Sequence, residues 1–161
     1  MVNKVWLTLD EFWNSFVDTA GNPTLTGRPA RAPNSPIPAF IEGYAKERNP
    51  TAPAGTTNMW RPARPPYITY PLVLPNFAEN TLARVTVWDQ WPTTPGQFSL
   101  VIDVLAQMRK AIHPTAGVIL NAGEAGLIVI HRENVISPPA DEDDPAWVRG
   151  IMNLRVTGYV F

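Results

Sequence analysis

The chain has 161 residues, with 13 basic and 14 acidic side chains, so its formal net charge is −1. A composition of 45% hydrophobic and 17% charged residues is that of a folded protein, and the length predicts one domain with a sizeable core. The lack of cysteine excludes disulfides, iron–sulfur clusters, thiolate zinc sites and a cysteine nucleophile, and the near-neutral charge argues against general binding to nucleic acid or membranes.

Charge and proline divide the chain into parts. Residues 1–20 carry a net charge of −2, residues 21–66 carry +4, and residues 67–161 carry −3. Ten of the 18 prolines lie between residues 23 and 66. We therefore expect N-terminal helices and a proline-rich basic arm over residues 1–66, and an α+β body over residues 67–161, within one globular domain. Such an arm is either a solvated linker or a segment that binds a partner.

The first part of the chain predicts two helices. Residues 8–11 (Thr-Leu-Asp-Glu) have the capping-box pattern that opens a helix, an apolar face follows them, and Gly21 is a plausible stop. A second helix is expected over residues 39–48, since Pro38 suits a first helical turn and Pro50 follows its end. Because Asp10 and Glu11 interrupt the N-terminus, we expect no signal peptide and a soluble intracellular protein.

The body predicts two strands, a helix and three more strands. Residues 67–74 form the first strand, and Pro71 and Pro75 imply that it lies at an edge or a bulge. A strand over 82–89 precedes an amphipathic helix over 98–112. Residues 118–120 and 127–130 flank a glycine turn and predict a hairpin, and period-two alternation predicts a last strand over 151–161. The fold class is α+β, with one main packed helix on a mixed or antiparallel sheet of about five strands.

Motifs of catalysis are absent from the sequence. No serine lies in a G-x-S-x-G turn, the glycines form no phosphate-binding loop, and His113 and His131 do not have a paired metal-ligand spacing. We therefore expect a protein that is not an enzyme, with no catalytic residues, no metal and no cofactor.

Four consecutive acids, Asp141, Glu142, Asp143 and Asp144, form the densest charge cluster. Oxygen ligands suit Mg²⁺ and Ca²⁺, but consecutive side chains cannot all converge on one ion, and the spacing of a calcium loop is absent. Prolines bracket the run on both sides. The cluster is therefore interpreted as a loop between strands, either simply solvated, or a functional negative surface, or a metal site.

Tryptophan and arginine supply the candidate interface residues, because both are enriched at protein interfaces. Stacking of a nucleic acid base or a sugar is the alternative for the tryptophans. The candidates for subunit or partner contacts are Arg28, Arg31, Trp60, Arg61, Arg64, Trp88, Trp91 and Trp147.

The order of elements resembles the tail terminator (tail completion, head–tail joining) proteins of long-tailed bacteriophages. The similarity covers about residues 60–161: the run Pro65–Tyr70, a strand ending at Val87-Trp88-Asp89, the helix Phe98–Ile112, a glycine-bearing hairpin, the acidic loop and a closing strand Arg149–Phe161. It rests on a pattern of elements and short local phrases. The segment before residue 60 is longer and richer in proline than this family needs, which leaves another phage neck or head-completion protein as the alternative, beside a tryptophan-lined ligand-binding module and a metal-dependent hydrolase.

The resemblance implies a ring of this chain on the end of the tail tube, and such rings usually have six copies in that family. Such a ring stops tube polymerisation and joins the tail to the head. The implied partners are other copies of the chain, the tail tube protein and the head–tail connector or neck proteins; the implied location is the virion, after assembly in the host bacterial cytoplasm. DNA would pass through without specific binding, with the acidic loop Asp141–Asp144 facing the bore. The arm would reach a neighbouring subunit or the adjoining ring, so a chain without residues 22–58 should keep its fold and assemble poorly.

Overall fold

A computed structural model describes residues 2–19, 32–71, 81–90, 100–136 and 147–159 of the chain. Over these residues it contains two α-helices, one 3-10 turn and ten strands. The helical elements are α1 (Val2–Trp13), α2 (Val101–Ala111) and η1 (Gly123–Ala125). The strands are β1 (Val17–Asp18), β2 (Ser35–Pro36), β3 (Ala39–Ile41), β4 (Lys46–Arg48), β5 (Trp60–Pro62), β6 (Tyr67–Tyr70), β7 (Thr81–Gln90), β8 (Val118–Asn121), β9 (Leu127–Ile136) and β10 (Trp147–Tyr159).

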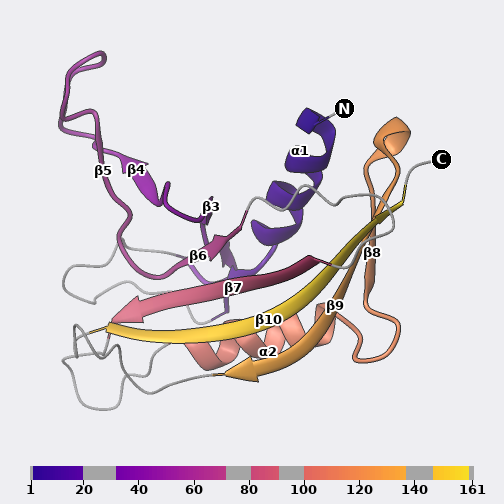
Figure 1. The fold of residues 1–161 in the computed structure, drawn as a ribbon. Helices are drawn as coiled ribbons and strands as arrows, with labels where there is room; N and C mark the ends of the chain where they lie inside the picture. The colour runs from indigo at the N-terminus through magenta and orange to yellow at the C-terminus, as the bar shows by residue number, and fades with distance from the viewer. Residues whose placement is uncertain (1, 20–31, 72–80, 91–99, 137–146, 160–161) are drawn as a thin grey trace.

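Six strands form the main sheet, in the order β3-β6-β7-β10-β9-β8. Neighbouring strands are antiparallel except for β3 and β6, which are parallel. The long strand β10 lies in the middle and pairs with β7 on one side and β9 on the other (Figure 1). The predicted α+β class is therefore confirmed, and the sheet has one strand more than expected because β3 joins it.

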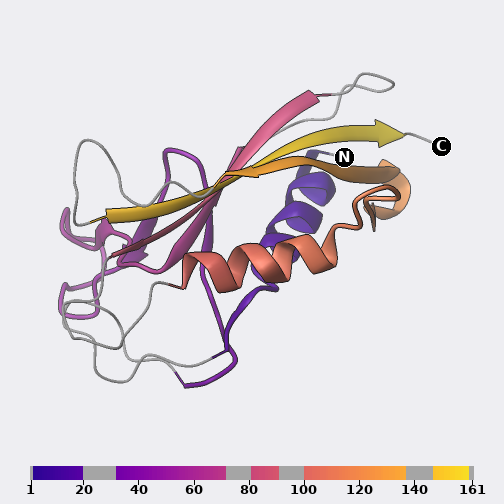
Figure 2. The ribbon, with the colours of Figure 1, turned by 90° about the horizontal axis from the view of Figure 1, so that it is seen from below.

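Both helices lie on one face of this sheet, called here the inner face (Figure 2). Side chains of successive residues in β10 alternate, so Val148, Met152 and Leu154 are buried under the helices. The amphipathic pattern that predicts α2 agrees with its position, because its apolar face joins the same core. The other face of the sheet, the outer face, carries neither of the two described helices.

Gly150 sets how closely α2 approaches the sheet. A Cβ atom at this position would lie 2.4 Å from Cγ1 of Val101 and 2.5 Å from Cδ1 of Leu105. Real Cβ atoms do not make such contacts, so any other residue here would have to displace the side chains of Val101 and Leu105.

Helix α1 begins earlier than the sequence predicts. It starts at Val2, and the Thr8 hydroxyl donates to the Lys4 carbonyl 2.8 Å away, as a threonine in mid-helix does. The capping box expected at Thr8 is therefore wrong. The apolar face itself was assigned correctly, since Leu9 and Trp13 of the helix lie in the core.

The second helix, predicted over residues 39–48, is wrong. These residues form β3, a turn and β4, and Gly43 in the turn has a φ of +84°. The residues of β3 adopt a strand in spite of their helical spacing, because their backbone pairing with β6 extends the sheet and buries Ala39. Ile37 beside it is fully buried as well, so a deletion of residues 22–58 would remove part of the core and is not a clean test of the arm.

The other predicted elements of the body keep their order. Strand β7, helix α2 and the β8–β9 hairpin confirm the predicted strand, helix and hairpin. Strand β10 begins at Trp147, earlier than the expected residue 151. Strand β6 lies between β3 and β7, so the expected edge position is wrong for it and belongs to β3. Residues 72–74 lie outside the described residues.

Candidate interaction surface

The first candidate surface is the projecting hairpin, residues 44–64, which stands away from the main sheet (Figure 1). Among the described strands, β4 and β5 pair only with each other, in a separate two-stranded sheet. Backbone bonds extend this pairing beyond the strands, from Asn49 N to Met59 O at 2.9 Å and from Ala63 N to Ala45 O at 3.0 Å. The hairpin is therefore a preformed element with little packing on the body.

Three charged side chains hold the base of the projecting hairpin. Oε1 of Glu47 accepts a hydrogen bond of 2.6 Å from Nε of Arg61 and another of 2.6 Å from Nε of Arg64. Burial acts to raise the pKa of Glu47, but the two guanidinium groups outweigh it, so this pKa lies below its usual value. Two of the predicted interface arginines therefore share one carboxylate of their own hairpin.

Large aromatic side chains are exposed on the projecting hairpin. Trp60 is 54% exposed and Tyr44 is 73% exposed. Residues of these types are the usual anchors of protein interfaces, because they bury a large area at a small cost in side-chain entropy. Trp60, predicted as an interface residue, is therefore placed where a partner can reach it.

The second group of predicted tryptophans packs within the molecule. The rings of Trp88 and Trp147 meet edge to face at 6.3 Å, and Tyr67 lies at 6.3 Å from each of them. Nε1 of Trp88 donates to the Thr69 hydroxyl at 2.9 Å, and the Arg149 guanidinium lies 6.0 Å from the Trp88 ring centre. Burial raises the pKa of Tyr67. These three rings pack against one another. They therefore fit a structural cluster better than an open site on which a ligand could stack.

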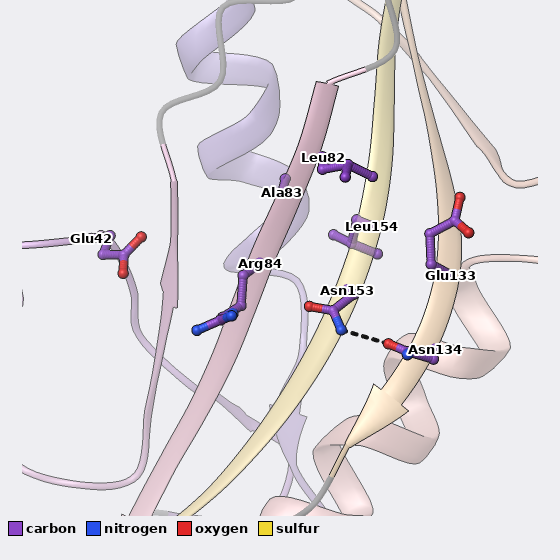
Figure 3. A pocket seen from close by; sticks show the side chains of 8 residues that line it. All are labelled: Glu42, Leu82, Ala83, Arg84, Glu133, Asn134, Asn153 and Leu154. Carbon is purple, nitrogen blue, oxygen red and sulfur yellow. Dashed lines mark hydrogen bonds between the residues drawn. The ribbon is translucent and has the colours of Figure 1, made fainter.

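The third feature is a depression of about 590 Å³ on the sheet (Figure 3). Its lining residues come from β7, β9 and β10, together with the turn after β3. They are Glu42, Leu82, Ala83, Arg84, Glu133, Asn134, Asn153 and Leu154. It is open and shallow, which suits a protruding side chain better than an enclosed small molecule.

Polar pairs fix one side of the depression. Nδ2 of Asn153 donates to Oδ1 of Asn134 at 2.6 Å, and Arg155 pairs with Glu133 at 2.5 Å. Both pairs flank the bulge where the register between β9 and β10 shifts. On the other side, Arg84 is exposed and makes no hydrogen bond or ion pair within the described part of the chain. The depression therefore offers a guanidinium that no described residue engages by a hydrogen bond or an ion pair.

Two buried polar contacts of the body were not found from the sequence. The Asp89 carboxylate is fully buried and accepts from the backbone N–H of Gln90 and of Leu100, each at 2.8 Å. Leu100 precedes α2, so this charge lies where the helix dipole favours it. The sequence signal that could have predicted this contact is an acidic residue at the end of an apolar strand, shortly before a helix.

The second buried contact joins α1 to β6. The Tyr70 hydroxyl donates to Oδ1 of Asp10 at 2.7 Å. Burial and the adjacent carboxylate raise the pKa of Tyr70 well above its usual value. Nothing in the local sequence pattern links these two residues, because the contact depends on how α1 docks.

The histidines have structural contacts. Nδ1 of His113 accepts from the backbone N–H of Thr115 and Ala116, which shapes the turn after α2. The ring of His131 lies against Gly117, where a Cβ atom would meet its Nδ1 at 2.9 Å. Over the described ranges, no group of three or more His, Asp or Glu side chains is arranged to hold a metal ion.

Several predicted interface residues lie outside the described residues. They are Arg28, Arg31, Trp91, Asp141, Glu142, Asp143 and Asp144. Among the predicted residues that are described, Trp60, Arg61 and Arg64 gather on the projecting hairpin, and Trp88 and Trp147 gather in the body.

Comparisons of this chain with family models, curated proteins and solved structures found no match. Neither described helix is long and apolar enough to cross a membrane.

Proposed function

We propose that the chain is a structural protein of a long-tailed phage virion. It forms a ring at the end of the tail tube, stops tube polymerisation and joins the tail to the head. It performs no turnover, and its partners are its own copies, the tube protein and the neck or connector proteins. DNA passes through the ring without specific binding.

The observation that supports this proposal is a pair of surfaces on one small domain that the described residues leave open. Both described helices cover the inner face of the sheet, which leaves the outer face with its depression, and the projecting hairpin exposes Trp60 and Tyr44. A protruding element and a different receiving surface on the same chain suit head-to-tail contacts. Such heterologous contacts close into rings when the rotation between copies allows it.

The arrangement of charge fits the same proposal. Glu47 partly neutralises Arg61 and Arg64, so these arginines stiffen the hairpin, and Trp60 and Tyr44 remain its exposed aromatic contact groups. A ring around DNA should avoid many free cations in its bore, because each phosphate contact would retain the DNA. The acidic run Asp141–Asp144 is our candidate for lining the bore.

Inactivation of the gene in the genome that encodes it tests this function directly. With a stop codon early in the gene, tail tubes should grow beyond their normal length and heads should remain unjoined. Supplying the protein from a plasmid is the matched control and should restore both. Tubes of normal length with unjoined heads would assign the chain to another neck protein, and normal joined particles would overturn the proposal.

A further inference from the structure

We propose that the projecting hairpin is an inter-subunit arm, and that Trp60 of one copy docks into the depression lined by Leu82 and Arg84 of a second copy. This inference rests on the part of the proposed function that has copies of the chain assemble with one another. It adds the contact between the copies.

The hairpin has the features of a segment that inserts into another copy of the chain. It lies in its own two-stranded sheet, and such a hairpin gains stability when another surface covers it. The ion pairs of Glu47 with Arg61 and Arg64 fix its base in advance, which lowers the entropic cost of docking. Trp60 is more than half exposed on it, with Tyr44 exposed at its start.

The depression has the features of a receiver for an indole ring. Leu82 on its rim is 76% exposed and offers an apolar contact. Arg84 beside it makes no ion pair within the described residues, and a guanidinium packs favourably on the face of tryptophan. Glu42 at the periphery supplies a carboxylate for the cations of the hairpin (Figure 3), whereas Glu133 is already paired with Arg155.

Charge complementarity identifies a second copy as the occupant. Residues 44–64 contain four basic side chains and one acidic side chain, so the hairpin carries +3. The whole chain carries −1, which leaves −4 for the remainder. A positively charged arm and a negatively charged body on the same chain attract each other between copies, and this steers association.

Crosslinking between two single-cysteine variants tests the contact, because the natural chain has no cysteine. One variant carries Asn58→Cys, which is exposed on the hairpin and leaves Trp60 in place; the other carries Leu82→Cys and a size tag. After mixing and mild oxidation, we expect the mixed disulfide dimer on a non-reducing gel. Ile102→Cys on α2 is the matched control, since Ile102 is 74% exposed, and it should give little product with Asn58→Cys.

A second variant removes the anchor without touching the core. Trp60→Ala in the Asn58→Cys chain should lower the yield of the mixed dimer about tenfold or more, as expected for an anchor residue. Trp60→Phe in the same chain should retain most of the mixed-dimer yield. An equal yield with Ile102→Cys, or no effect of Trp60→Ala, would overturn the inference.

Native mass of the same samples separates this inference from the proposed function. Rings without the Asn58–Leu82 crosslink would overturn the docking mode and leave the function standing. A crosslink within a closed pair of copies would support the docking mode and contradict a ring. A monomer without any crosslink, at the highest concentration that stays in solution, would overturn the docking mode.

Discussion

The main sheet with helices α1 and α2, called the body from here on, and the projecting hairpin are stabilised in opposite ways. The body buries apolar side chains between one sheet face and two helices, and its buried polar groups, such as Asp89, have backbone donors. The hairpin buries little and is held by its own backbone pairing and by Glu47 with two arginines. Its largest aromatic residues, Trp60 and Tyr44, are exposed, whereas Trp13 in the body is 2% exposed.

This difference shows what each tryptophan does. A buried tryptophan contributes to the stability of its own chain through the area that it removes from water. An exposed tryptophan on a stiff hairpin contributes little there, and it is free to contribute to an interface. Variants of the two regions should therefore separate folding from assembly.

The largest effect on stability is expected from Trp13→Ala. Trp13 lies among Phe12, Phe16 and Tyr70 in the core, so its truncation should lower the free energy of unfolding by about 3–5 kcal/mol. Urea unfolding followed by circular dichroism measures this change. Trp60→Ala is the control, and it should change the same free energy by less than about 0.5 kcal/mol. Equal losses in the two variants would contradict the division between the regions.

The next effect is expected from Asp89→Ala. This change leaves the N–H groups of Gln90 and Leu100 without their carboxylate, which should lower the free energy of unfolding by about 1.5–3 kcal/mol. Thermal unfolding monitors the loss. Thr19→Ala removes the exposed hydrogen bond to Asp103 and serves as the comparison, with a change near zero. A stability of Asp89→Ala equal to that of the natural chain would show that this carboxylate does not support α2.

Gly150→Ala tests the close approach of α2 to β10. The added Cβ atom must displace Val101 and Leu105, so we expect a loss of about 1–3 kcal/mol in the free energy of unfolding. The matched change is Gly55→Ala in the hairpin, where a Cβ atom meets nothing within 4 Å but the φ of +81° disfavours alanine. That variant should lower global stability less than Gly150→Ala. The reverse order in denaturant unfolding would contradict this packing.

The smallest effect on global stability, below about 1 kcal/mol, is expected from Glu47→Gln, because its ion pairs are largely at the surface. Its effect should be local and pH-dependent. The folded pKa of Glu47 is lowered, so its contribution is fully present above the usual value of 4.5 and is lost as the pH falls through the lowered pKa. Protection factors of the hairpin amides, which are exchange rates corrected for the intrinsic effect of pH, should therefore fall in the natural chain when the pH drops from neutral to below the lowered pKa of Glu47. In Glu47→Gln they should be low at both pH values. No difference between the two proteins would show that these ion pairs do not hold the hairpin.

The sequence pattern predicted those elements in which apolar residues recur at the helical or strand period because one regular face is buried. Helix α2 and strand β10 each bury one regular face, so their apolar positions repeat at the helical and strand periods. Residues 39–48 also place Phe40, Ile41 and Tyr44 at helical spacing. The strand conformation of residues 39–41 depends on pairing with β6, in which each paired residue lies 29 positions further along the chain (68 − 39 = 29), so it leaves no local signal.

The candidate interaction surface could be predicted only in part. Residue type alone pointed to Trp60, Arg61 and Arg64, and the structure gathers these on one hairpin. Arg84 and Leu82 could not be found, because an outward residue in a strand has the same pattern whether its face is covered or open. Whether a tryptophan packs inside, as Trp88 does, or projects, as Trp60 does, depends on tertiary contacts.

Native mass across a concentration series, with negative-stain images of the largest species, tests the proposed ring most directly. We expect a species near 107 kDa, about six times the 17.8 kDa of one chain, with a central hole. Replacement of residues 46–62 by two glycines should leave the body folded and abolish this species. A particle of 17.8 kDa at every concentration, with and without tube protein, would contradict the ring.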